Sequence, residues 1–349
     1  MFLKSHSPNT PSATLSSETL QIRPKLGFLG VGWIGRHRME AVAESGLAQV
    51  SAIADPVAES AQTAAQSVPG TRIVPKMANL LAEDIDGVVI ATPSALHADQ
   101  SIAALEAGKA VFCQKPLGRN AAEARAVISA ARKADRLLGV DLCYRHVKAF
   151  QEIQKRIQTG EIGKIYGVDL VFHNAYGPDK DWYYNPAEAG GGCVIDLGIH
   201  LVDFLLWSLD FPEVDRVTSR LFKKGRPVQG DRREVEDYAV ARIDFGGGPS
   251  AALACSWGLQ AGRDAVISAA FYGTEGGLKL TNVNGSFYDF QAELYRGTSR
   301  EVLCEPPDAW GGRAAVAWAE QLSRSARFNP AIEEMIPVSE VLDAVYECN

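Results

Sequence analysis

Asp196 and His200 are the two side chains in this sequence whose types and spacing best fit acid–base chemistry. They are four residues apart in a stretch otherwise made mostly of Val, Ile, Leu and Phe, so a helix places them on one face, one turn apart. A polar pair on so apolar a helix is unsatisfied unless that face borders a cavity. A neutral imidazole there can take a proton from a hydroxyl group. The alternative is a buried hydrogen bond between Asp196 and His200 that only holds the helix in place.

Lys115 offers a cation for the same chemistry. It comes two residues after the apolar stretch 110–113, and the next residue is a proline, which ends the strand because it has no N–H for a ladder hydrogen bond. The carboxyl edge of an open parallel sheet is where ligands bind, so we expect Lys115 to emerge there. A lysine at a strand end is commonly only a solvated charge. Its interpretation as a functional group depends on Asp196 and His200 lying nearby.

A glycine-rich loop near the start of the chain indicates a bound dinucleotide. Residues 30–35 read GVGWIG, after a strand predicted over 25–30 and before a helix predicted over 34–44. In such a G-x-G-x-x-G loop the glycines allow a tight turn and a close approach of the pyrophosphate, and the helix N-terminus offers N–H groups to the anion. Asp55, at the end of the second predicted strand, can accept hydrogen bonds from the adenosine ribose.

The surroundings of Asp55 favour one nicotinamide cofactor over the other. The carboxylate would repel a 2′-phosphate, and residues 56–59 contain no cation to bind one. We therefore expect NAD rather than NADP. The segment from Thr92 to His97 follows the fourth strand, where a Rossmann sheet places a ligand-facing loop, although His97 also fits an ordinary first-turn helix residue. The predicted cofactor-binding residues are Gly30, Gly32, Trp33, Ile34, Gly35, Asp55, Thr92, Pro93, His97, Gln114 and Lys115.

Two patterns of secondary structure position these residues. Up to residue 142, short apolar strands alternate with Ala-rich helical stretches such as 95–107 and 121–134, which predicts a doubly wound parallel Rossmann sheet. After residue 144, long strands separated by Gly- and Asp-rich turns predict a C-terminal α+β domain with a large, mostly antiparallel open sheet. Strands are predicted at 25–30, 50–55, 72–74, 87–92, 110–113, 138–143, 163–173, 214–222, 238–245, 250–259 and 265–273, and further helices at 147–159, 194–209, 314–328 and 338–347. The fold class is therefore α/β, with a flexible extension at 1–24, a Rossmann domain at 25–146 and a second domain at 147–349.

Charge and composition exclude several classes of partner. With 35 Lys and Arg against 42 Asp and Glu, the net charge is −7, so no basic field is available to hold nucleic acid or an anionic membrane. The longest apolar runs fall short of the roughly 18 residues of a membrane span. We expect a small-molecule partner and a cytoplasmic protein. The six cysteines lack a C-x-x-C pair or a close histidine, which predicts buried free thiols and no metal site.

In the order of these motifs, the sequence resembles the glucose–fructose oxidoreductase, inositol dehydrogenase and rhizopine-catabolism family (Gfo/Idh/MocA) of sugar oxidoreductases. The resemblance rests on the loop at 30–35, Thr92-Pro93 with His97, Gln114-Lys115-Pro116, Tyr144-Arg145, Gly160 to Ile165, Gly190 to His200, Gly273 to Gly276 and Ala344 to Glu347. It implies an NAD(P)-dependent enzyme that transfers a hydride between the cofactor and a secondary alcohol of a sugar, cyclitol or related polyol. It also implies a C-terminal substrate domain whose open sheet forms a homodimer or homotetramer.

The same resemblance assigns roles to particular residues. It places the family's catalytic lysine, aspartate and histidine at Lys115, Asp196 and His200. We expect His200 to act as general base, Lys115 to stabilise an alkoxide, and Asp196 to orient His200 or the substrate. Residues near the loop before Gly190 are expected to complete the pocket, although its aromatic run also fits ordinary loop packing. The predicted substrate-binding residues are Lys115, Arg145, Asn174, Tyr176, Trp182, Tyr183, Asp196 and His200.

Position 114 departs from the family pattern. The family usually has Glu-Lys-Pro, and Gln114 keeps the size of Glu but removes a negative charge beside Lys115. That loss is expected to lower the pKa of Lys115 or to alter a contact near the nicotinamide ribose.

Other functions fit the same motifs. One is a nucleotide-sugar oxidase or an NADPH-dependent aldose reductase of the same fold. Another is an NAD-binding regulator without catalytic activity, against which the intact set of Lys115, Asp196 and His200 argues. No Lys/Arg cluster accompanies the predicted pocket, which favours an unmodified sugar.

Overall fold

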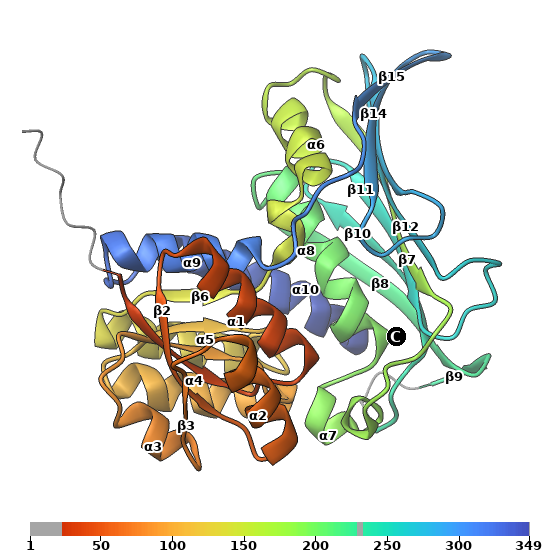
Figure 1. Cartoon of the computed structure of the whole chain (residues 1–349). Coiled ribbons are helices and arrows are strands. Elements are labelled where there is room, and N and C mark those ends of the chain that lie inside the picture. The colour runs from red at the N-terminus through yellow and green to blue at the C-terminus, as the bar shows by residue number, and fades with distance from the viewer. Residues whose placement is uncertain (1–22, 229–232, 349) are drawn as a thin grey trace, which may run out of the picture.

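The computed structural model describes residues 23–228 and 233–348 (Figure 1). The predicted N-terminal extension lies outside the described residues up to residue 22. The described residues form two sheets, one of six strands and one of nine. The predicted fold class is confirmed, because the first sheet is parallel throughout and the second is mostly antiparallel. The domain limits at 146 and 147 stay a prediction.

The first sheet has the strand order β3-β2-β1-β4-β5-β6. Strands β2 and β3 are added on one side of β1, and strands β4 to β6 are added on its other side. Strands β4 and β5 are buried along their whole length because helices cover both faces. Its strands are β1 (Lys25–Leu29), β2 (Gln49–Ala54), β3 (Arg72–Ile73), β4 (Gly87–Ile90), β5 (Ala110–Cys113) and β6 (Leu138–Val140). Its helices are α1 (Trp33–Ser45), α2 (Ala58–Ser67), α3 (Met77–Leu81), α4 (Ser94–Glu106) and α5 (Ala121–Ala134).

The second sheet has the order β15-β14-β13-β12-β7-β11-β10-β8-β9. Only β7 and β11 pair in parallel among its described strands. Its strands are β7 (Ile165–Asn174), β8 (Val214–Lys223), β9 (Arg226–Pro227), β10 (Tyr238–Phe245), β11 (Ser250–Ser256), β12 (Ala265–Gly273), β13 (Gly277–Asn282), β14 (Phe290–Arg296) and β15 (Ser299–Cys304). The last three lie beyond the strands that the sequence pattern predicts.

Helices cover one face of the second sheet and leave the other bare (Figure 1). Along β7, Val168, Leu170 and Phe172 are buried, whereas the residues between them are partly or fully exposed, as expected for a sheet with one covered face. The covering helices are α6 (Lys148–Gln158), α8 (Ile199–Ser208) and α10 (Met335–Glu347). A short helix, α7 (Pro186–Ala189), and four short 3-10 or π turns (143–146, 181–184, 194–198 and 330–334) complete this half.

Helix α9 (Arg313–Arg324) returns from the second half of the chain to the first sheet. The Trp318 ring packs 5.6 Å from the Phe112 ring, centroid to centroid, and both belong to a buried cluster with Phe28. A Cβ at Gly139 would lie 2.7 Å from the Trp318 ring, so a glycine makes room for it. Residues of α9, more than 170 positions after the end of β6, therefore complete the core of the first sheet.

One stretch, Pro186–Ser208, is long and apolar enough to cross a membrane by length and composition alone. In the structure, 94% of its most apolar window is buried inside the protein. It is therefore a core helix segment, and it carries Asp196 and His200.

Candidate active site

A cavity of about 1090 Å³ lies where the carboxyl edge of the first sheet meets the second half of the chain. Lys115, Asp196 and His200 all line it, as does the glycine-rich loop. The structure therefore brings the two predicted sites together. Of the residues predicted to bind cofactor or substrate, those lining the cavity are Gly30, Gly32, Trp33, Ile34, Asp55, Thr92, Pro93, His97, Gln114, Lys115, Trp182, Tyr183, Asp196 and His200.

The glycine-rich loop has the shape that a pyrophosphate requires. Gly30 has a φ of 82°, and a Cβ there would lie 2.6 Å from the Ala91 carbonyl oxygen. A Cβ at Gly35 would lie 2.1 Å from the Gly30 carbonyl oxygen, so the third glycine lets α1 pack against the turn. Nothing lies within 4 Å of a Cβ at Gly32, which begins α1 without a side-chain cap. The open space and free N–H groups fit a dinucleotide phosphate.

Asp55 closes the same loop. Its carboxylate accepts hydrogen bonds from the Val31 N–H at 2.7 Å and the Val57 N–H at 2.8 Å. These bonds fix a negative charge at the end of β2 and on the wall of the cavity. The position fits the acidic residue that binds adenosine ribose hydroxyls in a Rossmann fold.

His97 connects two loops at the sheet edge. Its Nδ1 lies 2.6 Å from the Pro116 carbonyl oxygen and its Nε2 lies 2.7 Å from the Thr92 carbonyl oxygen. The side chain is buried, and this burial lowers the pKa of His97. With both ring nitrogens against backbone carbonyls, His97 holds the loop after Lys115 in place.

Lys115 and Asp196 form the central ion pair of the site. The Lys115 ammonium donates to the Asp196 carboxylate and to its backbone carbonyl, each at 2.7 Å. The other carboxylate oxygen accepts from the Trp257 indole N–H at 3.0 Å. Burial disfavours the charge on Lys115, but the neighbouring carboxylate outweighs it and raises the pKa of Lys115 above its usual value. Lys115 is therefore a charged hydrogen-bond donor. The effect of Gln in place of Glu at position 114 on this pKa stays a prediction.

His200 lies beside this pair but does not bond to Asp196. The segment 194–198 is a π-helical turn that continues into α8, so the spacing of four residues does not bring the two side chains together as it would in an α-helix. Asp196 instead faces Lys115 and Trp257. The His200 ring packs 4.7 Å from the Tyr144 ring, between centroids. Burial and the positive charges of Lys115 and Arg38 hold the pKa of His200 well below its usual value.

Glu236 holds the start of this helical segment, and the sequence patterns do not reveal it. Its carboxylate accepts from the N–H groups of Gly192 and Val194 at 3.0 Å and from the Tyr346 hydroxyl at 2.8 Å. A Cβ at Gly192 would lie 1.9 Å from the Glu236 carbonyl oxygen. The glycine run before the helix therefore allows the close contact that fixes the position of Asp196.

Three of the predicted substrate residues do not line the cavity. Arg145 instead binds Asp203 at 2.7 Å and Glu334 at 2.6 Å. The Asn174 side chain accepts from the Tyr176 N–H at 2.8 Å, and the Tyr176 hydroxyl binds the Asp264 carboxylate at 2.7 Å. Further residues that line the cavity without having been predicted to do so include His37, Arg38, Asp141, Tyr144, Phe172, Asp179, Lys180, Phe287, Tyr288 and Trp310.

The aromatic run before α7 does reach the cavity. Trp182 and Tyr183 are stacked with their ring centroids 3.8 Å apart, and both line the wall. Tyr288 and Trp310, from the distant C-terminal part of the chain, line the cavity as well and pack with centroids 5.9 Å apart. Flat apolar faces beside a few polar groups suit the binding of a sugar ring.

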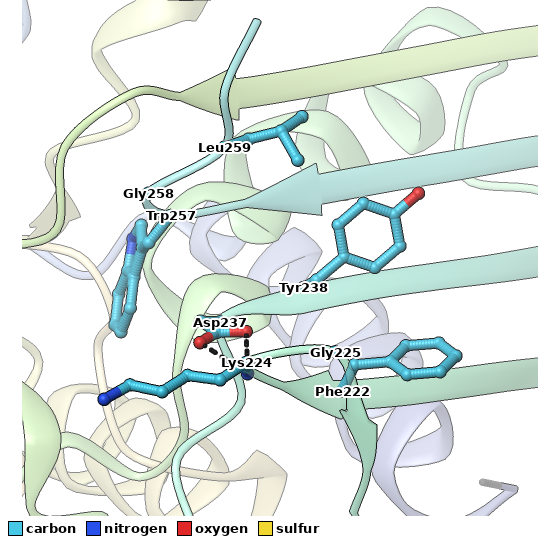
Figure 2. A pocket seen from close by; sticks show the side chains of 8 residues that line it. All are labelled: Phe222, Lys224, Gly225, Asp237, Tyr238, Trp257, Gly258 and Leu259. Carbon is cyan, nitrogen blue, oxygen red and sulfur yellow. Dashed lines mark hydrogen bonds between the residues drawn. The ribbon is translucent and has the colours of Figure 1, made fainter.

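A second hollow of about 570 Å³ lies at one end of the bare face of the second sheet (Figure 2). The Phe222 and Tyr238 rings stand on neighbouring strands, 5.9 Å apart between centroids. Trp257 also lines this hollow. Its N–H donates to Asp196, so Trp257 connects this hollow with the active site.

Comparison with known proteins identifies the family. Residues 25–142 match an oxidoreductase family with an NAD-binding Rossmann fold, and residues 150–279 match the GFO/IDH/MocA C-terminal domain. The chain belongs to the GFO/IDH/MocA family. The predicted family is thereby confirmed. It is a family of oxidoreductases that bind a nicotinamide cofactor.

Two members of the GFO/IDH/MocA family illustrate the distance between this chain and its relatives. The D-glucoside 3-dehydrogenase of Escherichia coli (strain K12) is 29% identical over 236 residues, 65% of this chain and 65% of that protein. The rhizopine catabolism protein MocA of Rhizobium meliloti is 31% identical over 186 residues, 53% of this chain and 57% of that protein. The chain therefore spans less than two thirds of the length of either relative.

The fold is shared over almost the whole chain. The structure of levoglucosan dehydrogenase in complex with NADH and levoglucosan superposes with a TM-score of 0.79, covering 94% of this chain and 97% of that one, at 23% sequence identity.

Proposed function

We propose that this protein is an NAD(P)-dependent dehydrogenase of a sugar, cyclitol or related polyol. The observation that carries the proposal is the position of the Lys115–Asp196 ion pair and His200 in the same cavity as the dinucleotide loop. Glucosides and levoglucosan appear in the names of the relatives and of the solved structure, which supports a polyol as the substrate class.

Each of the three residues has a role that follows from its surroundings. A bound nicotinamide would accept the hydride from the substrate carbon. The charged Lys115 donates a hydrogen bond to the alcohol oxygen and stabilises negative charge on it. His200, whose pKa is lowered, is neutral near pH 7 and accepts the hydroxyl proton at a ring nitrogen. Asp196 holds the Lys115 ammonium in place through two hydrogen bonds.

The proposal is tested by a substrate screen. Purified protein is mixed with NAD or NADP and a panel of sugars, cyclitols, sugar acids and nucleotide-linked sugars, and formation of the reduced cofactor is followed by fluorescence. We expect turnover with an unmodified polyol. Turnover only with nucleotide-linked sugars would instead indicate a nucleotide-sugar oxidase. Tight binding of NADH without turnover of any compound would indicate a regulator.

Asp55 is proposed to favour NAD. Replacing it with serine removes the negative charge that repels a 2′-phosphate while keeping one hydroxyl oxygen as an acceptor for the Val57 N–H. We expect Asp55→Ser to shift the ratio of NADPH to NADH affinity toward NADPH by about tenfold or more, corresponding to about 1.4 kcal/mol. Fluorescence titration of both reduced cofactors measures this ratio. An unchanged ratio would show that Asp55 does not select the cofactor.

The bare face of the second sheet is proposed to pair with further copies of the chain. Tyr166 and Tyr272 are 62% and 40% exposed there, and the exposed Ala252 lies between Arg242 and Asp169 in the middle of the face. We expect light scattering to give a dimer or tetramer and Ala252→Arg to shift it toward monomer. A wild-type monomer at micromolar concentration would contradict this proposal.

We also propose that the protein acts in the cytoplasm. All six cysteines are free thiols, including Cys193 and Cys255, whose sulfur atoms lie 3.8 Å apart. Free thiols at such a distance suit a reducing compartment.

A further inference from the structure

Directly behind Lys115, a buried ion pair holds the Gln114 side chain. The Asp141 carboxylate follows β6, accepts from the Arg38 guanidinium at 2.6 Å, and also accepts from the Gln114 side-chain amide N–H. Both of these bonds go to one carboxylate oxygen, Oδ2. The Arg38 and Asp141 side chains are only 6% and 1% exposed. All three residues line the cavity.

This arrangement fixes the orientation of the Gln114 amide. Its nitrogen must face Asp141, because a carboxylate can only accept hydrogen bonds. Its oxygen therefore points away from Asp141, and no hydrogen bond within the described residues uses it. The second oxygen of Asp141, Oδ1, is buried and has no partner in the part of the chain that the structure describes. The cluster thus leaves two acceptors near the Lys115 end of the cavity.

The charge of the cluster also depends on residue 114. With Gln114, Asp141 is the only carboxylate and Arg38 balances it. A glutamate at 114 would place a second carboxylate within hydrogen-bond distance of the first, and two such groups can lie so close only if they share a proton.

We propose that Asp141 is a positioning residue of this active site. Its charge is balanced by Arg38, and its hydrogen bond to the Gln114 amide nitrogen turns the amide oxygen toward the bound cofactor or substrate. There the oxygen accepts a hydrogen bond from a hydroxyl or amide group. Positions 114 and 141 together hold a single carboxylate. The identity of the ligand in this inference rests on the proposed function, whereas the arrangement of charges does not.

The test is a charge exchange. Gln114→Glu adds a second carboxylate, Asp141→Asn removes the first, and the double variant Gln114→Glu/Asp141→Asn restores one carboxylate at the other position. The NADH and NADPH affinities of each are measured by fluorescence at pH 6 and pH 8. Gln66→Glu, which adds the same charge at an exposed position of α2, is the control. The melting temperature of each variant is measured alongside.

We expect each single variant to lose about tenfold or more in affinity at pH 8 and the double variant to recover to within about threefold of the wild type. The loss in Gln114→Glu should shrink at pH 6, where the two carboxylates share a proton more readily. Other titratable groups around the cluster are Cys113, Cys143 and His146 near Asp141 and His37, whose Nδ1 lies 3.2 Å from the Arg38 Nη1. Because the double variant keeps all of them, it separates their effect from that of the pair.

Three results would overturn the inference: a double variant no better than the worse single variant, a Gln114→Glu loss that is the same at both pH values, or single variants that bind as the wild type does. Failure of the proposed function is separate from these results. It would appear as wild-type binding of NAD(P)H without turnover of any polyol, and the affinity measurements need no substrate.

Discussion

Replacing Lys115 with methionine is expected to lower the single-turnover rate of reduced cofactor formation on the order of a thousandfold. Lys115 is charged, because the Asp196 carboxylate raises its pKa, and it is aimed into the cavity beside His200. Methionine keeps much of the length and removes the donor. The alkoxide charge would then develop without the hydrogen bond from Lys115.

The measurement is a rapid-mixing experiment with enzyme in excess over substrate. The affinity for NADH should change by no more than about threefold, because the glycine loop and Asp55 are untouched. Lys164→Met, at an exposed position outside the cavity, serves as the matched control. His200→Asn should slow the same step, since it removes the proton acceptor. Near wild-type rates in both Lys115→Met and His200→Asn would show that these residues do not carry the reaction.

Replacing Glu236 with alanine is expected to destabilise the protein by about 3–5 kcal/mol, which corresponds to a melting temperature lower by roughly 10 °C. Three donors would lose their acceptor in the protein interior, namely the N–H groups of Gly192 and Val194 and the Tyr346 hydroxyl. An unsatisfied buried donor costs its desolvation energy. The turn that carries Asp196 would lose its anchor, so turnover should fall as well.

Thermal unfolding of Glu236→Ala, Glu236→Gln and the exposed control Glu301→Ala tests this expectation. Glu236→Gln keeps one acceptor and the size of the side chain, so it should fall between the wild type and the alanine variant. A melting temperature of Glu236→Ala equal to that of Glu301→Ala would contradict the anchoring role.

Local sequence patterns were sufficient to predict the glycine-rich turn at 30–35 and the position of Asp55 beside it. The loop at 30–35, the strand before it and Asp55 all lie within a single β-α-β unit, so short-range spacing determines their geometry. Lys115 could be placed for a similar reason, since the end of a buried parallel strand must meet the ligand-binding edge. These predictions depend on secondary structure alone.

The parts of the site that could not be predicted depend on contacts between distant segments. Glu236 and Trp257 reach the helical turn of Asp196 from more than 40 residues away. The π-helical turn separates Asp196 from His200, and no spacing rule indicates it. Arg145 has the chemistry of a substrate-binding residue, but it forms an ion pair with the buried Asp203 carboxylate and does not line the cavity.

Strands β13 to β15 and the position of helix α9 also depend on contacts between distant segments, and the sequence patterns did not predict them. Strands β13 to β15 pair with one another and with β12 to extend the sheet, but they are short and their pattern is weak. Helix α9 follows them in the chain yet packs on the first sheet through Trp318. A sequence pattern shows that such a helix is amphipathic, but not which sheet receives its apolar face.

The most direct test of the proposed chemistry follows the transferred hydrogen. The polyol found by the screen is prepared with deuterium on the carbon that bears the reacting hydroxyl group, and the reduced cofactor is analysed by mass spectrometry. We expect one deuterium in the reduced nicotinamide for each turnover, and labelled cofactor to form on the order of a thousandfold more slowly in Lys115→Met. Reduced cofactor that carries no deuterium would contradict direct hydride transfer, and labelled cofactor that forms equally fast in Lys115→Met would contradict the role of Lys115 in it.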